Sequence, residues 1–344
     1  MKKVLNLLLI YIIICCNVKA NAQDFTERNK EIIEIANKIN EYYVFKDVAD
    51  LLSKKLKSEI ELKTFDNLTD KEFAESLSNY LTKNGNDLHF NVLYRPSEEE
   101  EKPVNEKEML KKYDAINKQY NYGFEKVMRL DGNIGYIEYS GFPEGNKSAQ
   151  EILDATMNFV SNTNALIIDL RNNRGGDGKM VQLFMSYFFD DKIKLSEMYT
   201  RYNNKTQENY TFKKVNGKKY LDKPVYLLVN KTTISAAEAF VYNLQQNKIA
   251  QVIGDKTYGA ANPIKVFFID KKYHLFIPIT IEKNSVTKTN WEHKGIVADV
   301  KIDSEKALIK AEILALENLL KSNTKTELTE NEIKEKILKL EEQL

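Results

Sequence analysis

Residues 232–240 read Thr-Thr-Ile-Ser-Ala-Ala-Glu-Ala-Phe and separate two segments of different pattern. The run before them, Val225–Val229, is apolar throughout, which predicts a buried strand. After them, apolar residues recur on one face of a helical pattern through residue 246. Ser235 is therefore expected where a strand turns into a helix, near the unpaired N–H groups that begin the helix.

Two roles suit a serine at this junction. Its hydroxyl could cap the helix by accepting a hydrogen bond from a backbone N–H group. It could instead be a nucleophile, which needs a base to take its proton and N–H donors to receive the oxyanion. The choice depends on the residues that the rest of the chain brings to Ser235.

The composition predicts a globular protein with one large or two ordinary domains, because 344 residues can enclose a sizeable core. The 51 basic and 50 acidic residues nearly balance. This balance gives no indication of a nucleic-acid partner or of binding to an anionic membrane surface.

The first 22 residues have the pattern of a secretory signal peptide. Lys2 and Lys3 precede the apolar run Leu7–Cys16, and Ala20–Ala22 offers small residues for cleavage, which would leave Gln23 first. The apolar run is short for a membrane span. We therefore expect an exported protein, periplasmic or secreted, with no stable membrane span after cleavage.

Lipid anchoring through Cys15 or Cys16 is the alternative, but the residues before them, Ile12–Ile14, are not small. We therefore favour cleavage. Removal of residues 1–22 takes away three lysines and no acidic residue, so the net charge becomes 48 − 50 = −2. The exported protein would contain no cysteine and would be stable without disulfides.

The patterns divide the remaining chain into four segments. Residues 23–95 carry helical apolar stripes and predict a small helical N-terminal domain, whereas residues 96–130 are rich in charge and predict an exposed connector. Residues 131–303 alternate apolar strands with amphipathic helices, which predicts an α/β core with a mostly parallel sheet. Residues 304–344 predict two charged helices.

The core segment contains several well-marked elements. Strands are expected at Ile134–Tyr139, Ala165–Leu170, Val225–Val229 and Ala250–Ile253. Helices are expected at Ser148–Ser161 and Met180–Phe189. Hairpins are expected within Lys194–Asn216 and around Asp270–Tyr273.

Three histidines are candidates for a base. His89 opens a strand pattern after a turn, a good position from which to project a side chain into a cleft. His274 lies in a predicted hairpin, where a structural or exposed role is expected. His293 lies in a loop and could have either role. A single histidine is more often structural than catalytic.

Two further segments could complete a site. Leu170–Gly176 follows a buried strand, and its paired glycines allow backbone amides to turn toward a ligand, although an ordinary strand-to-helix turn is an equal alternative. Glu292 lies beside the single tryptophan, Trp291, in a loop. Its carboxylate could orient a base or position the serine, or could simply face solvent.

Together these segments resemble the S41 serine peptidases, which include the carboxyl-terminal processing proteases, the tricorn core and the modules of interphotoreceptor retinoid-binding protein. The matching core segments are Ile134–Phe142, Ala165–Gly176, Val225–Phe240, Val252–Gly259 and Glu292–Val300. N-terminal likeness lies in Glu41–Phe45, Phe73–Glu75 and Asp87–His89. The resemblance covers about residues 30–302 and implies a ClpP/crotonase-like α/β core.

The resemblance also implies roles for single residues. Ser235 matches the family nucleophile, and the amides of Gly176 and Ala236 match its oxyanion donors. The processing proteases use a lysine base at a place that Ala260 occupies, so a Ser–Lys dyad is not expected. The tricorn-like branch uses a histidine before the core and a glutamate after it, and His89 and Glu292 fit those places.

Two departures from the family pattern bear on these roles. Leu88 stands where the tricorn-like branch often has a small polar residue, so a polar contact from this position to His89 is not expected. Residues 96–130 are too few for the PDZ domain of the processing proteases, so carboxyl-terminal specificity is not implied.

The resemblance thus implies an exported serine endopeptidase that cleaves peptides or unfolded proteins through an acyl-enzyme. No cofactor is expected, and no group of residues has the spacing of metal ligands. Two alternatives stay open: a non-catalytic protein that binds apolar ligands on the same fold, and a hydrolase of non-peptide esters.

Overall fold

The structure, a computed structural model of the chain, describes residues 27–96, 106–322 and 324–344. The predicted signal peptide lies outside these residues. The chain forms two compact units. The N-terminal unit comprises the described part of Met1–Glu101 with Thr200–Lys205 and Pro263–Thr280, and the core unit comprises the described remainder.

The N-terminal unit consists of helices packed beside a small sheet. A helix through residues 27–42 is followed by α2 (Lys46–Glu61) and α3 (Asp70–Gly85), as the apolar stripes predict. The antiparallel sheet has the order β1–β10–β9, with bounds Asn91–Tyr94, Tyr273–Pro278 and Ile264–Ile269. The predicted hairpin around Asp270–Tyr273 is confirmed.

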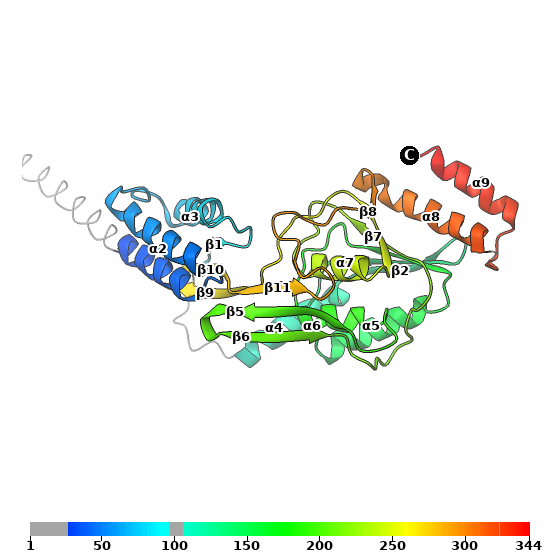
Figure 1. Ribbon diagram of the computed structural model, residues 1–344, viewed down its shortest axis with the longest axis horizontal. Coiled ribbons are helices and arrows are strands. Elements are labelled where there is room, and N and C mark those ends of the chain that lie inside the picture. Colours follow the sequence, from blue (N-terminus) through cyan, green and yellow to red (C-terminus); the bar gives the residue numbers. More distant parts are fainter. Residues whose placement is uncertain (1–26, 97–105, 323) are drawn as a thin grey trace, which may run out of the picture. The chain divides into compact units, whose positions relative to one another are not determined.

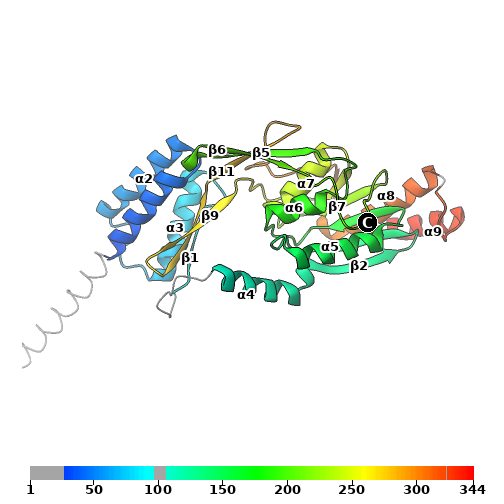
Figure 2. The ribbon, with the colours of Figure 1, turned by 90° about the horizontal axis from the view of Figure 1, so that it is seen from below.

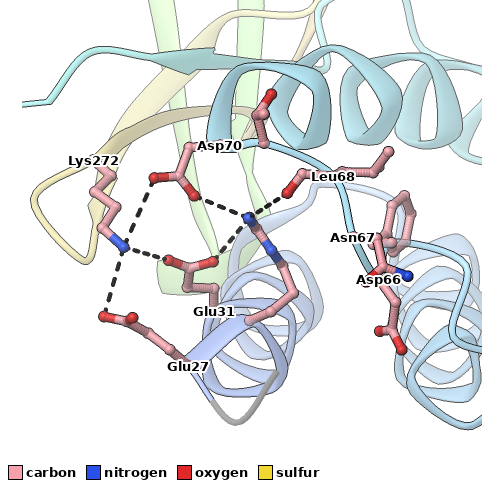
Figure 3. A pocket seen from close by; sticks show the side chains of 10 residues that line it. Glu27, Glu31, Asp66, Asn67, Leu68, Asp70 and Lys272 are labelled. Carbon is pink, nitrogen blue, oxygen red and sulfur yellow. Dashed lines mark hydrogen bonds and ion pairs between the residues drawn. The ribbon is translucent and has the colours of Figure 1, made fainter. Parts of the chain in front are cut away.

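A cavity of about 490 Å³ in this unit is lined by charged side chains (Figure 3). Arg28 donates to Glu31 at 3.1 Å and to Asp70 at 2.9 Å, while the Lys272 ammonium lies 3.4 Å from Glu31 and 3.5 Å from Glu27. Burial raises the pKa of Glu31 to about 7 against the opposing effect of the two cations. These contacts tie three segments of the unit together, and none of the residues predicted for the active site lines the cavity.

The core unit is built on a six-stranded sheet of order β12–β8–β7–β4–β3–β2 (Figure 1). The strands are β2 (Phe124–Leu130), β3 (Ile134–Tyr139), β4 (Ala165–Asp169), β7 (Val225–Val229), β8 (Ala250–Gly254) and β12 (Val300–Lys301). All neighbours pair in parallel except β2, which pairs antiparallel with β3. The predicted α/β core with a mostly parallel sheet is confirmed.

Helices cover both faces of this sheet (Figures 1 and 2). One face packs against α5 (Lys147–Val160), α6 (Gly178–Met185) and α7 (Ala236–Gln246). The other face packs against α8 (Ala307–Ser322), and α9 (Glu330–Glu341) packs on α8. Because side chains alternate along a strand, Leu166 and Ile168 enter the first core, whereas Ile167 enters the second.

A second small sheet has the order β11–β5–β6, with β5 at Lys194–Thr200, β6 at Lys205–Tyr210 and β11 at Thr280–Asn284. Its strands β5 and β6 form the hairpin predicted within Lys194–Asn216. The first four residues of β6 are exposed, in agreement with the polar sequence.

Three expectations about elements are wrong. The stretch predicted as a connector contains the helix α4 (Glu106–Gln119) and the strand β2. The sequence did not indicate β2, because this strand has few buried side chains and so lacks an apolar run. Helix α6 ends at Met185, since the Ser186 side chain bonds the Gln182 carbonyl and accepts the Phe212 N–H. Strand β1 begins at Asn91 and leaves His89 in the preceding turn.

Among the described residues, every helix is too short or too polar to cross a lipid bilayer.

Candidate active site

Ser235 occupies the junction between β7 and α7, as predicted, and its backbone is strained. Its φ of 59° and ψ of −120° lie in a region that residues with a Cβ rarely adopt. Such a conformation costs on the order of 1–3 kcal/mol and persists only when the surrounding structure enforces it. A sharp strand-to-helix turn of this kind exposes a serine hydroxyl above the edge of a sheet.

The loop before Ser235 is fastened to the loop after β4, because β4 and β7 are neighbours in the sheet. The buried Thr233 hydroxyl donates to the Leu170 carbonyl at 2.9 Å. The Ile234 N–H donates to the Asn173 carbonyl at 3.2 Å. These bonds bring the predicted oxyanion loop to the side of Ser235.

The Glu238 carboxylate, which is fully buried, holds the backbone of Ser235 from the other side. One oxygen accepts the N–H groups of Ser235 at 2.9 Å and Ala260 at 3.0 Å. The other accepts the Thr257 hydroxyl at 2.6 Å and the Gly259 N–H at 2.7 Å. Burial raises the pKa of Glu238, and these four donors oppose that rise.

The paired glycines of the oxyanion loop are required by close contacts. A methyl group on Gly175 would lie 2.9 Å from the Ala236 nitrogen and 3.0 Å from the Ser235 Cβ. A methyl group on Gly176, whose φ is 137°, would lie 1.9 Å from the Phe142 carbonyl oxygen. Only a residue without a Cβ allows this approach.

Two N–H groups near Ser235 have the properties expected of oxyanion donors. Within the described chain, neither the Gly176 nor the Ala236 N–H donates to a backbone carbonyl, whereas the Gly175 N–H donates to the Asn173 side chain at 2.9 Å. Ala236 begins α7, where the helix dipole favours negative charge. Their role in binding an oxyanion stays a prediction.

Glu292 does not face solvent: its side chain is 10% exposed. Its carboxylate accepts the N–H groups of Ala261 at 2.5 Å and Asn262 at 3.1 Å. The preceding Trp291 is buried and donates from its indole to the Ala260 carbonyl at 3.1 Å. Glu292 therefore holds the chain directly after the residues that Glu238 holds.

His89 belongs to the N-terminal unit, in the turn between α3 and β1. The backbone N–H of His89 donates to Asp87 Oδ1 at 3.0 Å, and the ring Nδ1 lies 4.0 Å from the same oxygen. Burial lowers the pKa of His89 to about 4. The imidazole is therefore neutral at neutral pH, which is the form that can accept a proton.

The other two histidines have different surroundings. His274 lies on β10, and its ring centroid is 4.8 Å from that of Phe268 in an edge-to-face arrangement. His293 has a φ of 60° and lies with Nε2 3.8 Å from Glu292 Oε1.

Ala260, which by the resemblance occupies the lysine position of the Ser–Lys enzymes, is buried, and its N–H donates to Glu238. The role of Glu238 was not predicted from the sequence. A signal was present, because Glu238 follows Ser235 by three residues, the spacing at which a glutamate reaches back to a helix start. Nothing in that spacing indicated the bonds to residues 257–260.

The family model described as Peptidase family S41 matches residues 133–302. This segment belongs to peptidase family S41. It includes β3 to β12 with Ser235, Gly176 and Glu292, whereas His89 precedes it.

Two curated relatives of this S41 segment are processing proteases. The chain is 30% identical over 172 residues to the carboxyl-terminal-processing protease of Synechocystis sp., covering 48% of this chain and 37% of the relative. It is 31% identical over 177 residues to the carboxy-terminal processing protease CtpA of Bacillus subtilis, covering 50% and 36%. The matched part of the chain thus spans little more than a third of each of these two relatives.

The fold of the S41 segment and its flanking regions has solved counterparts. The crystal structure of mature CPAF aligns with 88% of this chain and 99% of its own, with a TM-score of 0.58 at 11% sequence identity. At this identity the likeness concerns the fold alone.

Proposed function

We propose that this S41 protein is a serine peptidase that hydrolyses peptide bonds through an acyl-enzyme, with Ser235 as the nucleophile. The observation that carries the proposal is the strained Ser235 backbone at the start of α7, next to the glycine pair of the oxyanion loop. Strain of this kind is retained where it positions a reacting group. The S41 match over residues 133–302 supports the same chemistry.

In the proposed mechanism the Ser235 hydroxyl attacks the carbonyl carbon of the scissile peptide bond. His89 accepts the hydroxyl proton and then gives it to the leaving amine. Water next attacks the acyl-enzyme, again with His89 as the base, and releases the second product. The low pKa of His89 keeps the imidazole neutral and ready to accept at neutral pH.

The negative charge of the tetrahedral intermediate would be received by the amides of Gly176 and Ala236. Each such donor contributes on the order of 3 kcal/mol to transition-state stabilisation in acyl-transfer enzymes. Glu292 does not contact these donors in the described bonds. We assign it a positioning role, since its carboxylate fixes the segment that follows Ala260.

We further propose that the protein is exported after removal of residues 1–22 and acts on peptides or unfolded proteins. The apolar run and small residues before Gln23 support export. The similarity to two relatives named as processing proteases supports a protein substrate.

The test is hydrolysis of unstructured peptides by purified variants. Ser235→Ala and His89→Ala should each lower kcat by at least about 10³-fold with unchanged circular dichroism, because nucleophile and base act as one unit. Ser161→Ala, which alters a half-buried serine at the end of α5, is the matched control and should be fully active. Unchanged turnover in Ser235→Ala would reject the proposal and favour a binding protein on this fold.

A further inference from the structure

The oxyanion loop carries two arginines in different environments. Arg171 is engaged: its guanidinium lies 2.6 Å from Asp169 and donates to the Ser304 carbonyl at 2.7 Å. Arg174 is exposed, and in the part of the chain that the structure describes it forms no ion pair or side-chain hydrogen bond. Among the described residues, no contact of the Arg174 guanidinium stabilises this loop.

The backbone of Arg174 lies close to Ser235. It directly precedes Gly175, on which a methyl group would lie 3.0 Å from the Ser235 Cβ. Since consecutive Cα atoms are about 3.8 Å apart, the Arg174 Cα is within roughly 9 Å of the Ser235 Cβ. A side chain as long as arginine spans most of that distance, so its charge is available to substrate residues that flank the scissile bond.

Nearby carboxylates already accept hydrogen bonds from other donors. Asp177 caps α6, where it accepts the N–H groups of Met180 at 3.0 Å and Gly145 at 3.1 Å. Glu238 is buried and accepts four hydrogen bonds. A substrate carboxylate at this place would meet little competition for the guanidinium.

We propose that Arg174 is a specificity residue of the S41 site, which selects peptides carrying a carboxylate within two residues of the scissile bond. This inference rests on the proposed peptidase function. The planar guanidinium presents paired donors that match a carboxylate, a geometry that a lysine or an amide lacks. Because Arg174 is solvent-exposed, the preference should be moderate and should weaken with salt.

The experiment measures kcat/KM for matched pairs of internally quenched peptides. In the first set, the two peptides of each pair differ only by Glu or Gln at one position. There is one such pair for each of the two positions before and the two positions after the cleaved bond. A second pair differs only by a free or an amidated carboxyl terminus two residues after the cleaved bond. The first set reports an acidic side chain and the second pair a terminal carboxylate, so the two sources of the same chemistry are distinguished.

The wild-type enzyme should prefer the carboxylate member of at least one pair by about five-fold at low salt. In Arg174→Gln this ratio should fall to about one, while turnover of the neutral members is unchanged. Arg129→Gln is the matched control, because Arg129 is also an exposed arginine. Arg129 lies on β2 opposite Gly135, at the beginning of β3, whereas Ser235 lies beyond the other end of the sheet. This control variant should keep the wild-type ratio.

Equal rates for both members of every pair in the wild type would overturn the assignment and leave the peptidase proposal standing. So would a preference that Arg174→Gln retains. Absence of hydrolysis of all peptides by the wild type would instead reject the proposed function, and the assignment of Arg174 with it.

Discussion

The chemistry proposed for this chain depends on how a single residue is held. Ser235 adopts a backbone conformation that is unfavourable for a serine, and the Glu238 carboxylate binds its N–H group at 2.9 Å. The same carboxylate binds two amides and a hydroxyl after β8. We therefore infer that Glu238 positions Ser235. The four hydrogen bonds to the buried carboxylate offset the energetic cost of the strained Ser235 backbone.

Glu238→Gln tests this role. The amide nitrogen of glutamine cannot accept the hydrogen bonds that one carboxylate oxygen accepts, so two buried donors would face another donor. We expect the free energy of unfolding to fall by about 2–4 kcal/mol, since unsatisfied buried groups are costly. We also expect kcat/KM to fall at least tenfold as the Ser235 backbone relaxes, a loss that peptide turnover measured well below the unfolding temperature would reveal.

Glu332→Gln provides the comparison. Like Glu238, Glu332 is the third residue after a helix N-cap, and it accepts the Thr329 N–H at 2.8 Å, but the start of its helix is exposed. Its free energy of unfolding should change by less than about 1 kcal/mol, with no effect on turnover. A Glu238→Gln variant as stable and as active as this control would show that Glu238 does not position Ser235.

At the residue level, the sequence could predict candidate site residues where their position along the chain marks a strand end or a loop. Ser235, Gly176 and Glu292 could be singled out because of their places at strand ends or in a loop beside tryptophan. The contacts of Glu238 could not, because they join residues about 20 positions apart whose approach is set by β7 and β8.

The decisive element is the loop between β4 and α6, which the structure fastens at both ends. Phe142 forms an isolated parallel bridge to Gly176, donates to the Gly175 carbonyl at 2.8 Å, and accepts the Asp177 N–H at 2.7 Å. The loop is thereby held against the segment after β3. The amide of Gly176 has its direction fixed by these neighbours before any substrate binds.

Gly176→Ala should disrupt this element, because the added methyl group would lie 1.9 Å from the Phe142 carbonyl oxygen. We expect a loss of more than about 3 kcal/mol in the free energy of unfolding, measured by urea denaturation, and no measurable peptidase activity. Gly178→Ala alters the first residue of α6, directly after this loop, yet a methyl group there meets no atom within 4 Å. It should keep full activity and stability; equal losses in both variants would argue against the contact as the cause.

Elements with a strong apolar pattern were predictable, and elements without one were not. The strands β4 and β7 are buried along their whole length and read clearly as apolar runs. Strand β2 is exposed at most positions, so its sequence resembles that of a charged connector. Its place is decided by pairing with β3, a long-range contact that local pattern does not contain.

At the scale of the whole molecule, the residues proposed for catalysis are divided between the two units. Ser235, Gly176, Ala236 and Glu292 lie in the core unit, whereas His89 lies in the N-terminal unit. The S41 match begins at residue 133, after His89, so the assignment of His89 depends on the likeness of the N-terminal region and on the properties of the residue. Chief among these is a neutral imidazole at neutral pH.

The pH dependence of activity follows from that property. Because burial lowers the pKa of His89 to about 4, kcat/KM for a peptide without ionisable groups should rise through about pH 4 and be constant from about pH 5.5 to 8. A midpoint near 6.5, the ordinary value for histidine, would contradict a buried His89 base.

The same shift affects stability, which must be measured alongside. The unfolded chain binds a proton at His89 near pH 6.5 and the folded chain only near pH 4, so protonation favours unfolding as the pH falls between these values. Circular dichroism at each pH should show that the chain is still folded where activity declines. His89→Ala should lack this contribution to the pH dependence of unfolding.

The central claim, that Ser235 is an activated nucleophile, is tested most directly by covalent labelling with a fluorophosphonate followed by mass spectrometry of the digested protein. The account predicts one modified peptide, with the phosphonyl group on Ser235, and no labelling of Ser235→Ala. Failure of the wild-type protein to react, or modification of a different residue that persists in Ser235→Ala, would contradict it.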